Sequence, residues 1–164
     1  MSQRFYAIDS KIGSIALPAI PKCGQHTLVS LGGVELEFER LRDFPVRIAF
    51  VRCPVDRLVS CFSFFHKVGY HLPSIHMDSY EAFVDWALDS DDEHVLPQFQ
   101  LCSFHHFKRR FPLSRMTEVL GLLTGQSVTK ENPSEHYDVN AAYRLEDIKE
   151  RYHDDFAVYE EACE

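Results

Sequence analysis

The chain has 164 residues and a formal net charge of −8, because 25 acidic residues outnumber 17 basic ones. Apolar residues make up 45% and charged residues 26%, which is the composition of a globular domain and argues against a disordered chain. The excess of acid disfavours nucleic acid as a partner, since nucleic-acid affinity depends largely on Lys and Arg at phosphates. The length predicts a single domain over residues 1–164.

Neither a membrane anchor nor a disulfide framework is indicated. No apolar run approaches the ~20 residues that a transmembrane helix needs, and the first residues lack the apolar stretch of a signal peptide. The cysteines are five in number and form no Cys-x-x-Cys pair, which disfavours a zinc ribbon as well as paired disulfides. We therefore expect a cytoplasmic protein with no metal and no contact to a membrane.

Apolar runs and helical repeats alternate along the first part of the chain. Residues 14–20 and 46–51 are apolar enough to form buried strands, and residues 34–38 alternate as a half-exposed strand does. A loop after Cys23 turns into a short helix that stops at Gly32. Strands that alternate with helices predict an α/β domain with a mostly parallel sheet.

The second part of the chain contains more helices. Pro54 begins a helix at the first-turn position where proline is tolerated. Asp78 and Glu81 are spaced as in a capping box, which predicts a helix near residues 79–89. Further elements are expected as a strand over residues 104–111, a helix over 116–123 that Gly125 ends, and a C-terminal helix over 145–159.

The first strand is followed by a turn suited to an anion. Lys22 and Gly24 lie in this turn, directly before a helix whose first N–H groups have no partner within the helix. Gln25 or Thr27 can add a side-chain donor. The pattern is not a Walker A loop, because the lysine precedes the only glycine. Taken alone, it fits an ordinary solvated turn lysine equally well.

A second strand, turn and helix repeat this arrangement. Arg52 lies at the end of the strand over 46–51, where ligands bind in open α/β sheets. Pro54 begins the helix, and Ser60 follows two turns later. Arginine grips a phosphate with two donors and serine adds one more. The alternative is that Arg52 and Arg57 pair with nearby acids.

Together the two motifs resemble the two cofactor signatures of sulfotransferases that use 3′-phosphoadenosine 5′-phosphosulfate (PAPS). Pro21, Lys22 and Gly24 resemble the family's 5′-phosphosulfate loop. The second motif resembles the family's 3′-phosphate motif at each of its positions, Arg52, Pro54, Arg57 and Ser60. Residues 93–98, 132–134 and 152–156 resemble later stretches of the carbohydrate sulfotransferase branch, so the resemblance extends over about residues 14–159.

The resemblance implies a P-loop-like, three-layer α/β/α fold and a sulfuryl transfer from PAPS to a hydroxyl acceptor such as a carbohydrate, with PAP as the product. Lys22 would neutralise charge on the leaving 5′-phosphate, and Arg52 and Ser60 would hold the 3′-phosphate. The cofactor-binding set that it implies is Lys22, Cys23, Gly24, Gln25, His26, Thr27, Arg52, Ser60 and Lys130.

The general base is chosen from several acids and histidines. Glu35, Glu37 and Glu39 share one face of the strand expected over 34–38 and its extension, close behind the anion loop. His26 lies in the loop itself. We place Glu37 and His26 ahead of His66, and the remaining histidines in that region are His71 and His76.

Departures from the family pattern leave a second function open. Gln25 and His26 replace the hydroxyl pair that follows the loop glycine in the family. The alternative is therefore a non-catalytic protein that binds PAPS or PAP, or that serves in interactions. A P-loop kinase is a weaker third reading, because neither a Walker A loop nor a Mg²⁺-binding acid pattern is present. The histidine spacings match no standard metal motif.

The net charge is unevenly distributed. Residues 1–67 hold nine basic and six acidic residues, whereas residues 68–107 hold seven acids and no Lys or Arg. Both anion motifs therefore fall in the one basic third of the chain, and the overall acidity does not exclude a phosphorylated ligand.

Overall fold

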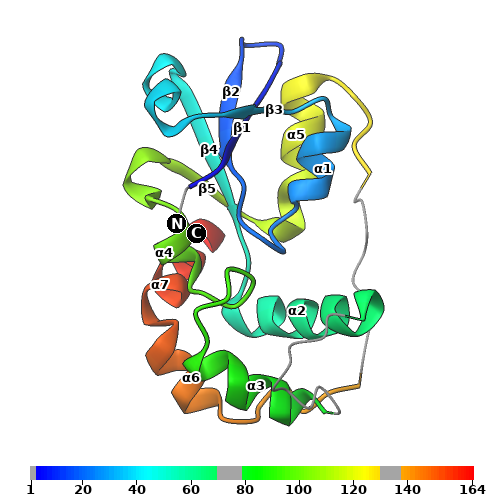
Figure 1. Cartoon of the computed structure of the whole chain (residues 1–164). Helices are drawn as coiled ribbons and strands as arrows, with labels where there is room; N and C mark the ends of the chain where they lie inside the picture. Colours follow the sequence, from blue (N-terminus) through cyan, green and yellow to red (C-terminus); the bar gives the residue numbers. More distant parts are fainter. Residues whose placement is uncertain (1–2, 70–78, 130–137) are drawn as a thin grey trace.

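A computed structural model describes residues 3–69, 79–129 and 138–164 of the chain. At its centre is a five-stranded sheet with the strand order β3-β1-β2-β4-β5 (Figure 1). The strands are β1 (Phe5–Ile8), β2 (Ile15–Pro18), β3 (Val34–Leu36), β4 (Val46–Val51) and β5 (Arg109–Pro112).

The sheet is mixed, so the expectation of a mostly parallel sheet is only partly met. β2 pairs with β4 and β4 pairs with β5 in parallel, whereas β1 pairs antiparallel with both β2 and β3. The connection between β1 and β2 is a tight turn in which Ser14 Oγ donates to Asp9 Oδ1 at 2.8 Å. A connection this short leaves no room for a crossover helix, so the two strands must be antiparallel.

Helices surround the sheet and its lower end. The α-helices are α1 (Gln25–Ser30), α2 (Pro54–Val68), α3 (Tyr80–Asp89), α4 (Gln98–Leu101), α5 (Met116–Thr124), α6 (Leu145–Arg151) and α7 (His153–Cys163). Short 3₁₀ segments occupy Phe38–Asp43, Phe104–His106 and Leu113–Arg115. Among the described residues no helix is both long and apolar enough to cross a membrane.

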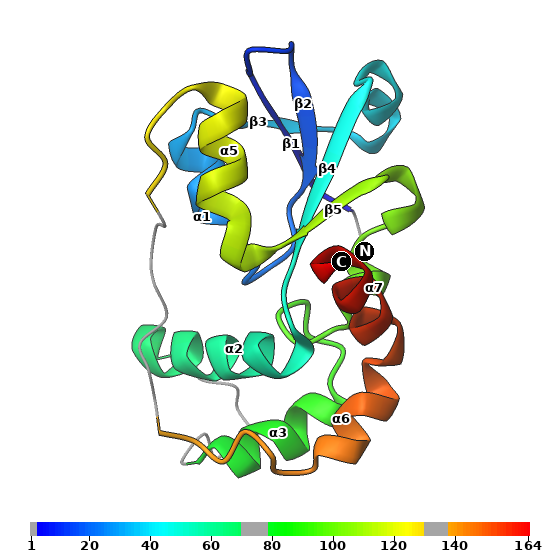
Figure 2. The same cartoon turned by 180° about the vertical axis from the view of Figure 1, so that it is seen from behind.

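The sheet carries helices on both faces, as an α/β domain should. α1 and α5 lie on one face, and α7 lies on the other (Figures 1 and 2). The side chains of β4 point alternately to the two faces of the sheet. Ile48 and Phe50 pack against buried residues of α1 and α5, whereas Ala49 and Val51 belong to the buried cluster that includes α7. The strand is therefore buried on both faces, which explains its unbroken apolar run.

A third cluster lies below the carboxyl ends of β2 and β4. There α2 runs beneath the sheet and packs on α3 and α6. Phe62 and Phe65, which are three residues apart on α2, are both buried, and their rings lie 5.7 and 5.9 Å from the ring of Phe83. This packing fixes α2 against the ends of the two strands that precede the anion motifs.

Three predicted elements differ in extent. The C-terminal helix is broken at Tyr152, whose hydroxyl donates to Val95 O at 2.6 Å, so that α6 and α7 are separate. The strand expected over residues 104–111 is limited to β5, because a 3₁₀ turn precedes it. The helix near residues 79–89 is confirmed, with Ser79 Oγ accepting from Ala82 N at 3.2 Å, while Asp78 lies outside the described residues.

The strand expected over residues 34–38, with Glu35, Glu37 and Glu39 on one face, is also shorter than predicted. β3 ends at Leu36, and a 3₁₀ segment begins at Phe38. Glu37 and Glu39 therefore do not share a strand face with Glu35, and that prediction was wrong. Period-2 alternation over so few residues cannot distinguish a strand from a strand followed by a turn.

Candidate functional site

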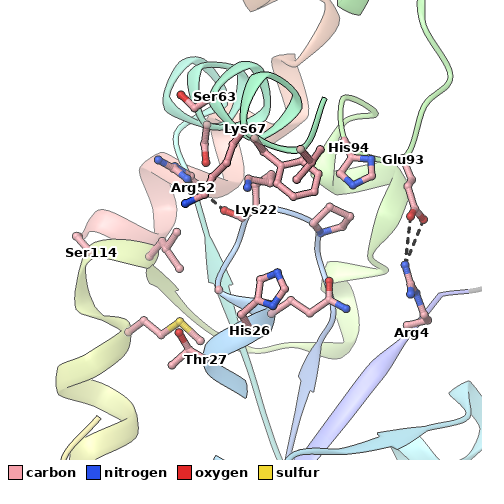
Figure 3. Close-up of a pocket in the computed structure, with 18 of the residues that line it drawn as sticks. Arg4, Lys22, His26, Thr27, Arg52, Ser63, Lys67, Glu93, His94 and Ser114 are labelled. Carbon is pink, nitrogen blue, oxygen red and sulfur yellow. Dashed lines mark hydrogen bonds and ion pairs between the residues drawn. The ribbon is translucent and has the colours of Figure 1, made fainter. Parts of the chain in front are cut away.

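A cavity of about 480 Å³ lies at the carboxyl ends of β2 and β4, between these strands and α2 (Figure 3). Its walls come from the loop after β2, the start of α1, the inward face of α2, the turn before α4 and the start of α5. Among the described residues that line it, four are Lys or Arg and one is an acid: Arg4, Lys22, Arg52, Lys67 and Glu93. The cavity is thus basic within an acidic protein.

The loop after β2 is held in an uncommon backbone conformation. Lys22 has φ = 64°, a left-handed value that costs a non-glycine residue roughly 1 kcal/mol or more. Two arginines bind the carbonyl oxygens of this loop: Arg57 Nε donates to Pro21 O at 3.1 Å and Arg52 Nη1 donates to Lys22 O at 3.3 Å. These bonds fix the turn that directs the Lys22 side chain into the cavity (Figure 3).

Lys22 is half-buried. Burial lowers the pKa of its ammonium group, and the Arg52 cation acts in the same direction. Its Nζ lies 4.3 Å from the centre of the Phe64 ring on α2, a distance typical of a cation–π contact. A bound anion would relieve the unfavourable burial of this charge, because it would supply the missing counter-charge.

Gly24 permits the loop to approach α5. It has φ = 88°, and a Cβ placed on it would lie 2.2 Å from Met116 Sδ and 3.2 Å from Leu113 Cδ1. A side chain at this position would therefore require the flexible Met116 side chain to shift away from the loop. α1 begins at the next residue, so its first N–H groups are adjacent to the cavity.

The first residues of α1 differ in what they offer. Gln25 Nε2 lies 3.3 Å from Tyr6 Oη, so the amide is engaged with β1. His26 is exposed and lines the cavity, and Thr27 is buried and lines it as well. Of the Gln25 and His26 side chains, that of His26 is thus the less constrained.

α2 lines the cavity with one face. Ser60, Ser63, Phe64 and Lys67 all border it, and they are spaced three or four residues apart as one side of a helix requires. Arg52 precedes this helix, and only one of its five N–H donors is used by Lys22 O. A guanidinium, two hydroxyls and an ammonium group are therefore gathered on one wall.

Arg57 has a structural role. It is 1% exposed, and it donates to Pro21 O, to Leu96 O at 2.7 Å and to Glu93 O at 3.3 Å. Neither the alternative of a pair with an acid nor a place in the cavity describes Arg57, because carbonyl oxygens of two separate turns hold its guanidinium. Arg57 thereby joins the anion loop to the turn before α4.

Gln98 and Asp155 support Arg52 from below. The Gln98 side chain accepts from Arg52 N at 3.0 Å and donates to Arg52 O at 2.8 Å, while its Oε1 also accepts from Cys23 Sγ at 3.0 Å. Asp155 in turn accepts from the N–H groups of Gln98 and Phe99 at 2.6 and 2.7 Å. Burial raises the pKa of Asp155, and these N–H donors oppose that shift.

Two stretches that resembled later family motifs thus meet in one network. Gln98 belongs to residues 93–98 and Asp155 to residues 152–156, which are far apart in the sequence. Neither side chain lines the cavity. Gln98 binds both the backbone N–H and the backbone C=O of Arg52, as well as the thiol of Cys23, and Asp155 holds Gln98 in place.

The remaining wall is the turn before α4. His94 lines the cavity with its Nδ1 2.9 Å from Asp92 Oδ1. Glu93 forms an ion pair with Arg4 at 3.3 Å, and both side chains are about 40% exposed (Figure 3). This pairing offsets the charge of the one acid among the described lining residues.

Most of the predicted site residues meet at this cavity. Lys22, Gly24, Gln25, His26, Thr27, Arg52 and Ser60 all line it. The Cys23 side chain does not: it is buried against Gln98, and burial raises the pKa of its thiol to about 12. Glu37 does not line the cavity either, because it follows the edge strand β3. Lys130, His71 and His76 lie outside the described residues.

Several lining residues were not predicted. Ser63 and Lys67 follow Ser60 at helical spacing, a signal that was present in the sequence. Phe64 packs on the core cluster of α2 and α3 and also lines the cavity, where it is half-buried. Arg4, Glu93 and His94 carry no local signal of their position, since only the folded chain brings them to the same cavity as Lys22.

The described residues contain no group of three or more His, Cys, Asp or Glu side chains suited to a metal ion. His105 and His106 lie next to one another, with ring centres 3.9 Å apart, and neither lines the cavity. Comparison of the chain with family models, curated proteins and solved structures finds no match. The basic cavity between two strand–loop–helix units is the candidate functional site of this chain.

Proposed function

We propose that the chain is a sulfotransferase that transfers a sulfuryl group from PAPS to a hydroxyl acceptor. The observation that carries this proposal is the meeting of Lys22, Arg52 and Ser60, from two separate motifs, in one basic cavity. Its volume of about 480 Å³ lies within the usual range for small-molecule sites of roughly 300–1,000 Å³. Two anion-binding groups in one such cavity suit a nucleotide with phosphates at both ends.

The two ends of the donor would bind to different motifs. Lys22 and the first N–H groups of α1 would hold the 5′-phosphosulfate. Arg52 and Ser60 would hold the 3′-phosphate, and Lys67 lies on the same helical face as Ser60. A P-loop-like relationship of the fold is part of this proposal, supported by the parallel strands β2, β4 and β5 and by loops at their carboxyl ends.

Sulfuryl transfer requires positioning and stabilisation of charge. The acceptor oxygen attacks sulfur in line with the bond to the 5′-phosphate, and the phosphate leaves with the electron pair. Lys22 would stabilise the charge that develops on that phosphate oxygen. Binding of the distant 3′-phosphate would orient the donor for this attack.

The acceptor proton must pass to a base on the cavity wall. Of the two residues placed first by the sequence, His26 lines the cavity and Glu37 does not. Glu37 is therefore no longer part of the proposed mechanism.

A second function is favoured by one contact. The amide of Gln25, at the position of the first family hydroxyl, is directed to Tyr6. If this leaves the phosphosulfate without a needed donor, the chain binds PAPS or PAP without catalysing transfer. The two functions share the nucleotide and differ in turnover.

Thermal denaturation with adenosine 3′,5′-bisphosphate (PAP) tests the proposal. A ligand at a hundred times its Kd stabilises by about 2.7 kcal/mol, which corresponds to a Tm increase of roughly 5–10 °C for a chain of this size. We expect this shift in the wild type and its loss in Lys22→Ala and Arg52→Ala. Exposed basic residues outside the cavity, Lys108→Ala and Arg42→Ala, are the matched controls.

Adenosine 5′-monophosphate, which lacks the 3′-phosphate, separates the two motifs. Lys22→Ala should weaken its binding, whereas Arg52→Ala should have little effect on it. Absence of any shift with PAP in the wild type rejects the cofactor assignment. Binding of PAP without transfer of labelled sulfate from PAPS to sugar, phenol or steroid hydroxyls favours the non-catalytic function.

A further inference from the structure

The turn before α4 presents a histidine whose ring is held on several sides. His94 Nδ1 lies 2.9 Å from Asp92 Oδ1, and the same carboxylate oxygen accepts from His94 N at 2.9 Å. The ring stacks on Phe64 at 5.6 Å and meets the edge of Phe65 at 5.3 Å. The side chains of Asp92 and His94 are only about one-fifth exposed.

These contacts determine which ring nitrogen is basic. An ionised carboxylate only accepts hydrogen bonds, so Nδ1 of His94 must carry the proton that faces Asp92. In the neutral ring, Nε2 is then the nitrogen with the lone pair. The main chain is fixed as well, because Cys61 Sγ donates to His94 O at 2.9 Å.

His94 also lines the cavity in which the reaction is proposed to take place. The Phe64 ring that stacks on His94 is the ring that Lys22 Nζ contacts at 4.3 Å. Lys22 and His94 both line the cavity, and Figure 3 draws the two side chains. The group that would stabilise the leaving phosphate and a nitrogen able to accept a proton thus share one neighbour.

We infer that His94, oriented by Asp92, is the general base of the proposed sulfuryl transfer. This inference rests on the proposed function. An acceptor oxygen forms its bond to sulfur while the bond from sulfur to the 5′-phosphate oxygen breaks, and that phosphate keeps the electron pair. The acceptor hydroxyl gives its proton to Nε2 of His94. The resulting imidazolium is stabilised by the Asp92 carboxylate, which stays ionised.

The other candidates on the cavity wall are less suited to this role. His26 is exposed, and no hydrogen bond to its ring is found among the described residues. Glu93 is already engaged in its ion pair with Arg4. A base needs an orientation that persists through the reaction, and among these three side chains the contacts of His94 supply it best.

Single-residue variants of the full chain test the assignment with radiolabelled PAPS and a panel of sugar, phenol and steroid alcohols, with water as a further acceptor. We expect His94→Ala to lose about 10²- to 10⁴-fold in kcat while the KM for PAPS and the thermal shift with PAP stay unchanged. Added imidazole should restore part of the rate in His94→Ala. Asp92→Asn should lower kcat without rescue by imidazole, because the base is present and misoriented.

Two further histidine variants make the test selective. His105→Ala, exposed and outside the cavity, should match the wild type. His26→Ala should weaken the PAP shift as a loop contact, and its rate should not respond to imidazole. These expectations separate a base from a binding residue and from a remote histidine.

The inference is overturned if His94→Ala keeps its kcat within about threefold, which is below any general-base contribution. Loss of PAP binding together with activity in His94→Ala, or imidazole rescue in His26→Ala instead, also overturns it. A wild type that binds PAP and transfers to no acceptor has no base to assign, so that result refutes His94 and leaves the binding function. A wild type that does not bind PAP refutes the proposed function itself.

Discussion

Removal of the Arg57 guanidinium should destabilise the protein strongly. In the native state Arg57 is fully buried and donates to three carbonyl oxygens, those of Pro21, Glu93 and Leu96. Hydrogen bonds to charged groups contribute about 1.5–3 kcal/mol each, and part of that sum is offset because a shorter apolar chain need not be dehydrated as a cation. We estimate a net loss of about 3–5 kcal/mol for Arg57→Met.

Urea denaturation followed by circular dichroism measures this loss. A decrease of this size corresponds to a fall in Tm of roughly 6–20 °C for a chain of this length. Arg57→Lys should recover only part of the stability, because an ammonium group does not reproduce the planar fork that reaches two turns at once. Arg42→Met, at an exposed arginine, is the control.

An Arg57→Met variant within about 1 kcal/mol of the wild type would refute the reasoning, since the carbonyl groups would then find other partners at no cost. Unchanged binding of PAP by that variant would show that Arg57 is not needed to fix the anion loop.

Two further predictions concern the anion loop. Gly24→Ala should lower the free energy of unfolding by about 1 kcal/mol more than Gly32→Ala, because both have positive φ while only at Gly24 would a Cβ force the buried end of the Met116 side chain to move; equal Tm losses in the two variants would contradict this. PAP binding should take up protons at alkaline pH, because burial lowers the pKa of free Lys22 and a bound phosphate would raise it. The affinity for PAP should therefore fall as pH rises. Calorimetry in buffers of different ionisation enthalpy measures the proton uptake on binding, and the same uptake in Lys22→Ala would show that Lys22 is not the group that is protonated.

The sequence predicted the position of the site better than its internal geometry. Lys22 and Arg52 each follow a buried strand, and the rule that ligands bind at the carboxyl ends of strands was sufficient to expect them together. The two strands, β2 and β4, are indeed parallel neighbours. The helix that begins at Pro54 was also predictable, because proline and a regular apolar spacing mark it.

Side-chain directions in the loop were not predictable. Whether Cys23 faces the cavity or the core depends on the positive φ of Lys22, and no local rule assigns that angle to a lysine. The roles of Arg57 and Gln98 depend on carbonyl groups and a strand end distant in the sequence. Such contacts form only when distant segments pack together, so they cannot be predicted from the spacing of residues or from the composition of the sequence.

The mixed sheet described above also has a consequence for how the chain folds. β1 and β2 are joined by a tight turn, so their pairing is local and needs little loop closure. The parallel pairs are not local, because β4 begins at Val46 after β2 ends at Pro18, and β5 begins at Arg109 after β4 ends at Val51. Both cavity loops follow strands that complete their pairing only across these long separations. We therefore expect the hairpin to form early and the cavity late, so that ligand should slow unfolding without accelerating refolding.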